Sequence, residues 1–296
     1  MKILGIGNAI VDVICKVEDD FITKNNLTKS TMKLIFDDKE FKDLLSNLKI
    51  EKTVSGGSVA NSIVGLSQLG NEVGFIGKVN DDDLGGKYED GLKRENVKYI
   101  YSKKKEELPT GTCLILVTPD SERTMCTFLG TAGKINENDV SSDAIKQSET
   151  ILLEGYLWDE GEPKKAFEKA ILNAKKVAMS LSDQFCVDRH KPHFLDLVKN
   201  KLDITFANEQ EIMSLIDAKS FEEVVMFALP FLGALTFHSN EPEFDYDKRM
   251  KQQTEFFRNL NYIPVGGCKV FTQKSQENGT TTGRACKQSD GSWKVE

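Results

Sequence analysis

The chain has 296 residues and a formal net charge of −7. This length allows one large α/β domain, or one domain with an appendage. The negative charge argues against a general nucleic-acid surface, and no apolar run is long enough to span a bilayer.

The amino terminus predicts a strand, because only Lys2 precedes its apolar stretch and no small-residue cleavage site follows. Four scattered cysteines show no metal-ligand spacing: Cys15, Cys113, Cys126 and Cys186. This usage is typical of buried thiols in a reduced compartment, so a cytoplasmic protein is expected.

The first strand is predicted over residues 2–7, with Asn8 at its end and Asp12 shortly after it. Ligand groups in α/β sheets collect at the carboxyl ends of strands. Asp12 is flanked by apolar residues on both sides, and burying a bare carboxylate is costly. A ligand hydroxyl would satisfy it. The alternative is a turn aspartate that bonds its own backbone.

A glycine turn followed by a helix is the central pattern of the chain. Gly56 and Gly57 precede apolar residues at helical spacing, and Gly70 stands where a C-cap is expected. Ser58 and Asn61 add polar side chains near the free N–H groups of the helix N-terminus, an arrangement that suits hydroxyl-rich or anionic ligands. The alternative is a tight turn with an N-cap.

A second buried strand is predicted over residues 72–79, ending in Asn80 and the aspartates 81–83. These aspartates suggest either a metal or an N-cap before a helix at 86–95, and the N-cap is better supported.

Further along, the pattern alternates. Residues 110–117 and 123–128 have the signature of a β-hairpin. Inserted among βα units, it suggests a small sheet that covers a site as a lid. Other elements are predicted as follows: strands at 33–36, 150–155, 176–181 and 203–208, and helices at 38–48, 163–175, 193–200 and 211–216. Strands that alternate with helices predict a parallel, doubly wound sheet.

Several motifs stand in a fixed order: Gly-Asn-x₃-Asp, Gly-Gly-Ser-x-x-Asn, Gly-Lys-Val-x-x-Asp-x-Leu-Gly, Thr-Gly-Thr with Glu-Arg-Thr, and Asn-x-x-Glu. Together they resemble the PfkB (ribokinase-like) family of sugar and nucleoside kinases, in its adenosine-kinase-like branch, over residues 1–228. The resemblance implies a three-layer α/β/α fold with a mainly parallel sheet. It also implies a small β-sheet lid at about 13–37 and 100–130, through which family members commonly dimerise.

The resemblance further implies phosphorylation of an alcohol group on a sugar or nucleoside, with ATP and Mg²⁺. It assigns substrate binding to these residues: Asn8, Asp12, Gly56, Gly57, Ser58, Asn61 and Arg123. Asn208 and Glu211 match the pair that organises the Mg²⁺ and phosphate network. Asn80 stands where the family usually has glycine and is expected to weaken that turn slightly.

The family's later Gly-Ala-Gly-Asp motif, which supplies an anion hole and the base aspartate, is absent from the sequence. The nearest string, Thr280–Cys286, lacks the aspartate and does not open an apolar helix, so no catalytic base is assigned. Impaired phosphoryl transfer is therefore expected. An inactive binding module and a truncated hybrid product are the alternatives.

Residues 229–296 read as an unrelated tail that replaces the end of the fold. A hairpin is predicted at 268–295, with Cys268 and Cys286 facing each other, and a short helix at 250–260. The hairpin region resembles the carboxyl-terminal end of rickettsial-type surface-antigen lipoproteins, so a sequence join near residue 228 is a hypothesis.

Overall fold

The computed structural model describes residues 1–158, 161–220, 223–224, 234–238, 268–275, 279–287 and 293–295. The chain divides into two compact units, Met1–Thr205 and Phe206–Glu296. The tail boundary expected at residue 228 stays a prediction.

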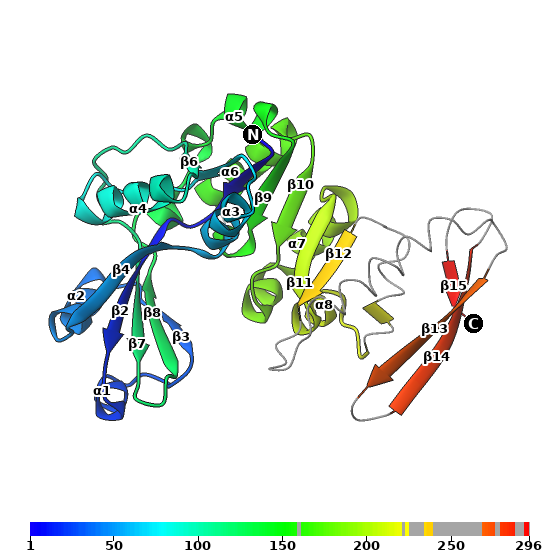
Figure 1. Ribbon diagram of the computed structural model, residues 1–296, viewed down its shortest axis with the longest axis horizontal. Coiled ribbons are helices and arrows are strands. Elements are labelled where there is room, and N and C mark those ends of the chain that lie inside the picture. Colours follow the sequence, from blue (N-terminus) through cyan, green and yellow to red (C-terminus); the bar gives the residue numbers. More distant parts are fainter. Residues whose placement is uncertain are drawn as a thin grey trace. The chain divides into compact units, whose positions relative to one another are not determined.

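The first unit is built on a parallel sheet with the strand order β10-β9-β1-β5-β6 (Figure 1). Its strands are β1 (Ile3–Ile6), β5 (Val73–Ile76), β6 (Lys98–Tyr99), β9 (Thr150–Glu154) and β10 (Val177–Ser180). The central strands are nearly continuous apolar runs because both faces of a parallel sheet are covered. Leu4, Ile6 and Leu153 are fully buried.

Helices join these strands and confirm the predicted α/β fold with its layers on the sheet. They are α3 (Ser58–Gln68), α4 (Asp83–Arg94), α5 (Ser142–Gln147), α6 (Glu162–Asn173) and α7 (Gln184–Asn200), with short 3₁₀ turns η1 (Ala132–Lys134), η2 (Glu137–Asp139) and η3 (Gly155–Leu157). Helix α3 packs on β1, β5 and β9 through its fully buried Ile63.

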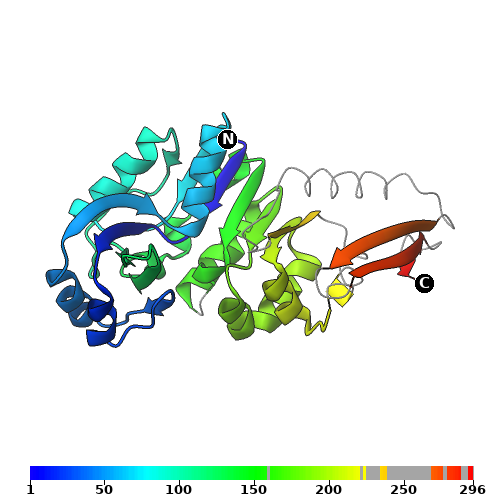
Figure 2. The same cartoon turned by 60° about the horizontal axis from the view of Figure 1, so that its bottom comes forward.

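A second, mixed sheet with the order β3-β8-β7-β2-β4 extends from the first (Figures 1 and 2). Its strands are β2 (Ile10–Lys16), β3 (Met32–Leu34), β4 (Ile50–Gly56), β7 (Thr112–Val117) and β8 (Arg123–Phe128), with α1 (Asp19–Lys24) and α2 (Asp38–Ser46) between them. The predicted hairpin is confirmed as the antiparallel pair β7–β8. Strand β4 was not predicted from the sequence.

The two faces of this second sheet differ in burial. Val13, Leu114 and Cys126 lie on one face and are at most 2% exposed. Phe41 of α2 packs on the same side against Phe128, with ring centroids 5.5 Å apart. The opposite face carries Asp12 and three apolar side chains that are only half-buried, Ile14, Ile115 and Met125. All four scattered cysteines are buried, as expected: Cys15, Cys113, Cys126 and Cys186.

The second unit contains α8 (Glu209–Ile216), which follows β11 (Ile204–Asn208), and β12 (Ala234–His238). It also contains β13 (Cys268–Ser275), β14 (Gly279–Lys287) and β15 (Trp293–Val295), which form a three-stranded antiparallel sheet. The register pairs Cys268 with Cys286 across β13 and β14, in the region where the sequence analysis expects a hairpin. The helix expected at 250–260 lies outside the described residues.

Asp12 lies within β2, so the alternative of a turn aspartate does not hold. One expectation within the first unit was wrong in detail. Helix α7 begins at Gln184, well before the predicted start, because Asp183 caps it by accepting from the Cys186 amide at 2.6 Å. Pro192 lies inside this helix, so it does not mark the helix start. No helix among the described residues is long and apolar enough to cross a membrane.

Candidate functional site

The candidate site lies where the chain passes between the two sheets of the first unit. Residues 7–9 link β1 to β2, and Gly57 links β4 to α3. Ile10 pairs with Gly56 across β2 and β4, and Ile6 pairs with Leu153 across β1 and β9. These registers bring together segments that are far apart in the sequence.

Asp12 is a half-buried carboxylate without a protein partner. No described residue forms a hydrogen bond or ion pair with it, and burial raises the pKa of its carboxyl to about 6. A Cβ at Gly56 would lie 2.3 Å from Asp12 Oδ2, so only glycine leaves room for the carboxylate. The turn-aspartate alternative is excluded because β2 holds Asp12 in extended backbone.

Asn8 presents a second polar atom that no protein group satisfies. The residue is 3% exposed, and its Oδ1 has no hydrogen-bond partner among the described residues. Gly57 packs against its backbone: Gly57 has φ +100°, and a Cβ there would lie 2.3 Å from the Asn8 carbonyl oxygen. Buried polar atoms are normally hydrogen-bonded, so Asn8 Oδ1 is a candidate ligand contact.

Glu154, at the end of β9, is a site residue that the sequence reasoning missed. It is 2% exposed and accepts hydrogen bonds from the Asn8 amide at 2.5 Å and from Ser58 Oγ at 2.7 Å. Burial raises the pKa of its carboxyl to about 7, although these donors favour the charged form. The signal was a carboxylate directly after the apolar run Ile151–Leu153, the same signal that identified Asp12.

The structure brings some of the predicted residues together and leaves others apart. Ser58 and Asn61 lie in the first turn of α3 with exposed side chains, next to Gly57. Arg123 begins β8, whereas Asp12 is level with Cys113 and Thr127. Arg123 is therefore four residues along the strand from that level, roughly 13 Å at the usual strand rise.

Asn208 and Glu211 form a capping box at the start of α8, in the second unit. The Glu211 amide donates to Asn208 Oδ1 at 2.8 Å, and Asn208 Nδ2 donates to Glu211 Oε1 at 2.7 Å. This pair has a structural role by itself. Its donor chemistry, a carboxylate held beside an amide, also fits a water-mediated contact with Mg²⁺.

Asp82 serves as the N-cap of α4, as the sequence favoured. It accepts from the Gly85 amide at 2.8 Å and from Thr110 Oγ1 at 2.7 Å. Within the described ranges, no group of at least three His, Cys, Asp or Glu side chains is arranged to hold a metal ion.

The segment Thr280–Cys286 does not fit a phosphate cradle. It lies within β14 and pairs with β13 as a strand. A phosphate cradle needs the free N–H groups of a helix N-terminus, so this segment does not supply one for ATP.

Comparison with known proteins shows which family the chain resembles in sequence and in structure. Residues 23–232 match the pfkB family carbohydrate kinases. The adenosine kinase structure from Sinorhizobium meliloti is 35% identical, with a TM-score of 0.72 over 80% of this chain and 74% of that one. A probable sugar kinase from Rhizobium etli CFN 42 is 34% identical, with a TM-score of 0.72 over 81% and 74% of the two chains.

A curated relative, guanosine-inosine kinase of Escherichia coli strain K12, is 25% identical over 229 residues, which are 72% of this chain and 52% of that protein. The chain spans about half the length of the curated relatives it matches.

Proposed function

Because the chain belongs to the pfkB family of carbohydrate kinases, we propose that its first unit binds a nucleoside through neighbouring ribose hydroxyls. The observation that carries this proposal is Asp12, a half-buried carboxylate with no protein donor beside a glycine that makes room for it. Adjacent hydroxyls donate in pairs to such a carboxylate. They replace the water that burial removes. Asn8 Oδ1 and Asn61 are proposed as further contacts.

The sheet face around Asp12 favours a nucleoside over a free sugar. Ile14, Ile115 and Met125 pair in register across β2, β7 and β8, on the same face as Asp12. All three are only half-buried, unlike the side chains of the opposite face. A flat, largely apolar base would cover them and remove apolar surface from water. Two relatives named above, an adenosine kinase and a guanosine-inosine kinase, are named for nucleosides.

The alternative to a nucleoside on this face is a second copy of the chain, which would form a homodimer through the lid. Met32 of the outer strand β3 pairs with Met125 on this face and is 40% exposed. Sedimentation over a range of concentrations distinguishes the two arrangements, because only dimerisation raises the mass.

The proposed chemistry is phosphoryl transfer from ATP to an alcohol group, in a cytoplasmic protein. Mg²⁺ would neutralise charge on the phosphates there, and Asn208 and Glu211 are the residues proposed to hold it through water. We propose that transfer is impaired, since the sequence has no Gly-Ala-Gly-Asp motif. A base and an anion hole are each worth roughly 10²–10⁴-fold in rate.

The alternative is a module that binds nucleosides or sugars without turnover, or a hybrid product joined near residue 228. The hybrid rests on the resemblance to surface-antigen lipoproteins that the sequence analysis expects for residues 268–295. Sequencing an independent copy of the gene across residue 228 tests it, because a native join recurs in that copy.

Calorimetry tests the binding proposal. We expect adenosine, guanosine or inosine to bind more tightly than ribose, and Asp12→Asn to weaken that binding about tenfold or more, the loss of one or two charge-assisted hydrogen bonds. The matched control is Asp20→Asn, since Asp20 is 83% exposed on α1. Equal affinity of the Asp12→Asn protein, or no nucleoside binding at all, would contradict the proposal.

A further inference from the structure

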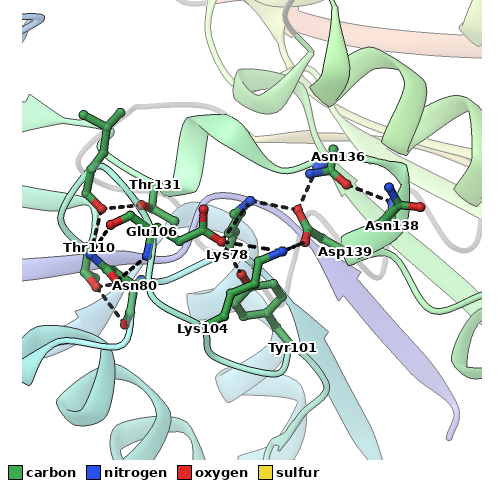
Figure 3. A network of polar contacts seen from close by, with 12 residues as sticks. Lys78, Asn80, Tyr101, Lys104, Glu106, Thr110, Thr131, Asn136, Asn138 and Asp139 are labelled. Carbon is green, nitrogen blue, oxygen red and sulfur yellow. Dashed lines mark hydrogen bonds and ion pairs between the residues drawn. The ribbon is translucent and has the colours of Figure 1, made fainter.

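Asn80 holds the segment that leads into β7. Its Nδ2 donates to the carbonyl oxygens of Glu106 at 3.3 Å and Leu108 at 2.9 Å, and its Oδ1 accepts from the Glu106 amide at 2.9 Å (Figure 3). The expectation that Asn80 weakens its turn was therefore wrong. Asn80 is not among the positive-φ residues, so the backbone does not require the glycine usual in the family.

Lys78, two residues before Asn80, fixes the same segment through ion pairs. Its Nζ lies 3.2 Å from Glu106 Oε1 and 3.2 Å from Asp139 Oδ2. The side chains of Lys78 and Asp139 are 5% and 3% exposed, and that of Glu106 is 18% exposed. A buried cation between two carboxylates leaves little freedom to any of the three.

The other side of the segment is also fixed. Thr131 donates from Oγ1 to the Leu108 carbonyl at 2.6 Å and from its amide to the Pro109 carbonyl at 2.9 Å. Thr110 donates from Oγ1 to Asp82 at 2.7 Å. Residues 106–110 are thus clamped between the turn after β5 and the exit from β8, as Figure 3 shows around Thr110 and Thr131.

Hydrogen bonds and close packing connect this segment directly to the strand that carries Asp12. The Val11 amide donates to the Gly111 carbonyl at 2.8 Å, and Asp12 pairs with Cys113 in the next register step. A Cβ at Gly111 would lie 2.7 Å from Ile10 Cδ1 and 2.6 Å from the Leu129 carbonyl oxygen. A displacement of residues 106–110 is therefore transmitted to β2.

We propose that Asn80 is a positioning residue: through residues 106–111 it sets where β2 holds the Asp12 carboxylate. Its effect on a ligand rests on the proposed function, whereas its effect on the backbone does not. Glycine at this position keeps the turn but removes all three side-chain hydrogen bonds. It should therefore make the segment before β7 more mobile and, through that segment, β2.

Asn80→Gly is the test, with Lys104→Met as the matched control. Lys104 contacts the same carboxylates, Glu106 at 3.7 Å and Asp139 at 3.4 Å, but its side chain is 56% exposed. Hydrogen exchange is measured at the amides of Val11 and Glu106 and, for reference, along β9. Inosine and adenosine affinities are measured by calorimetry on the same proteins.

We expect Asn80→Gly to speed exchange at Val11 and Glu106 about tenfold, as loss of one or two net hydrogen bonds predicts, with β9 unchanged. Nucleoside affinity should fall by a similar factor, and Lys104→Met should change neither quantity. Exchange that stays slow at Val11, rises equally along β9, or rises equally in the Lys104→Met protein would overturn the proposal. If the unmodified protein binds no nucleoside, the proposed function fails, while the exchange result still decides the role of Asn80.

Discussion

At the scale of single residues, the ionised Asp12 carboxyl destabilises the fold in the absence of a ligand. Burial raises its pKa from 3.8 to about 6. The folded pKa is the higher one, so its contribution to stability is fully present below pH 3.8 and is lost as the pH rises through about 6. Above that pH the ionised carboxylate costs up to about 3 kcal/mol.

Asp12→Asn removes this charge with little change of shape. We expect it to raise the free energy of unfolding by about 1–3 kcal/mol at pH 8, and to change it little at pH 3.5. Chemical denaturation at both pH values measures the difference, and Asp20→Asn is again the control. A gain of equal size at both pH values would show that burial of the charge is not the cause.

At the scale of elements, Gly57 determines how β4 turns into α3. Its φ of +100° strains any other residue, and a Cβ would meet the Asn8 carbonyl oxygen at 2.3 Å. We expect Gly57→Ala to cost about 2 kcal/mol or more in the free energy of unfolding, from strain and clash together.

Gly65→Ala is the matched control in the same helix, because nothing lies within 4 Å of a Cβ there. It should stabilise the protein by about 0.5–1 kcal/mol. Thermal or denaturant unfolding of both variants measures these effects. Changes of the same sign in the free energy of unfolding would show that Gly57 is not required by its backbone conformation and close packing.

The ion cluster of Lys78 gives a second prediction at this scale. Lys78→Met leaves Asp139 and the partly buried Glu106 with only the exposed Lys104 as a cation, so unfolding should become easier by about 3 kcal/mol. Lys104→Met removes only an exposed partner of the same two carboxylates and should change stability by less than about 1 kcal/mol. Urea denaturation of the two variants measures the difference. A similar loss in the free energy of unfolding for both variants would mean that burial does not determine how much these ion pairs stabilise the fold.

The elements also show what the sequence could and could not predict. Hydrophobic period and turn residues predicted the main strands and the β7–β8 hairpin, because these depend on local pattern. Strand β4 was missed because residues 50–52, at its start, are exposed and break the alternation. Asp12 and the glycine turn were identified from their neighbours. A local signal marked Glu154, the carboxylate after an apolar run, but its partner Asn8 is 146 residues away. The partners of Asn80 are 26–28 residues away, so no local pattern contains these contacts.

At the scale of the whole molecule, nucleoside binding and phosphate transfer require different structural features. The first unit has the features on which the proposed nucleoside binding rests: an unpartnered carboxylate, a glycine that makes room for it and a half-buried apolar face. Transfer of phosphate also needs a base and a phosphate cradle. The string of the sequence nearest to the Gly-Ala-Gly-Asp motif, Thr280–Cys286, lies in the strand β14.

We therefore expect binding and turnover to separate in this protein. With ATP, Mg²⁺ and the nucleoside that calorimetry shows to bind, transfer should be slower than in an intact family member by about 10⁴-fold or more, since the base and the anion hole act together. A radiolabelled phosphate-transfer assay with the S. meliloti adenosine kinase as reference measures this ratio. Asp12→Asn should abolish any residual turnover that belongs to this chain and leave a contaminating kinase unaffected. A rate within tenfold of the reference, lost in the Asp12→Asn protein, would show that the carboxyl-terminal segment supplies a base that the sequence motif does not reveal.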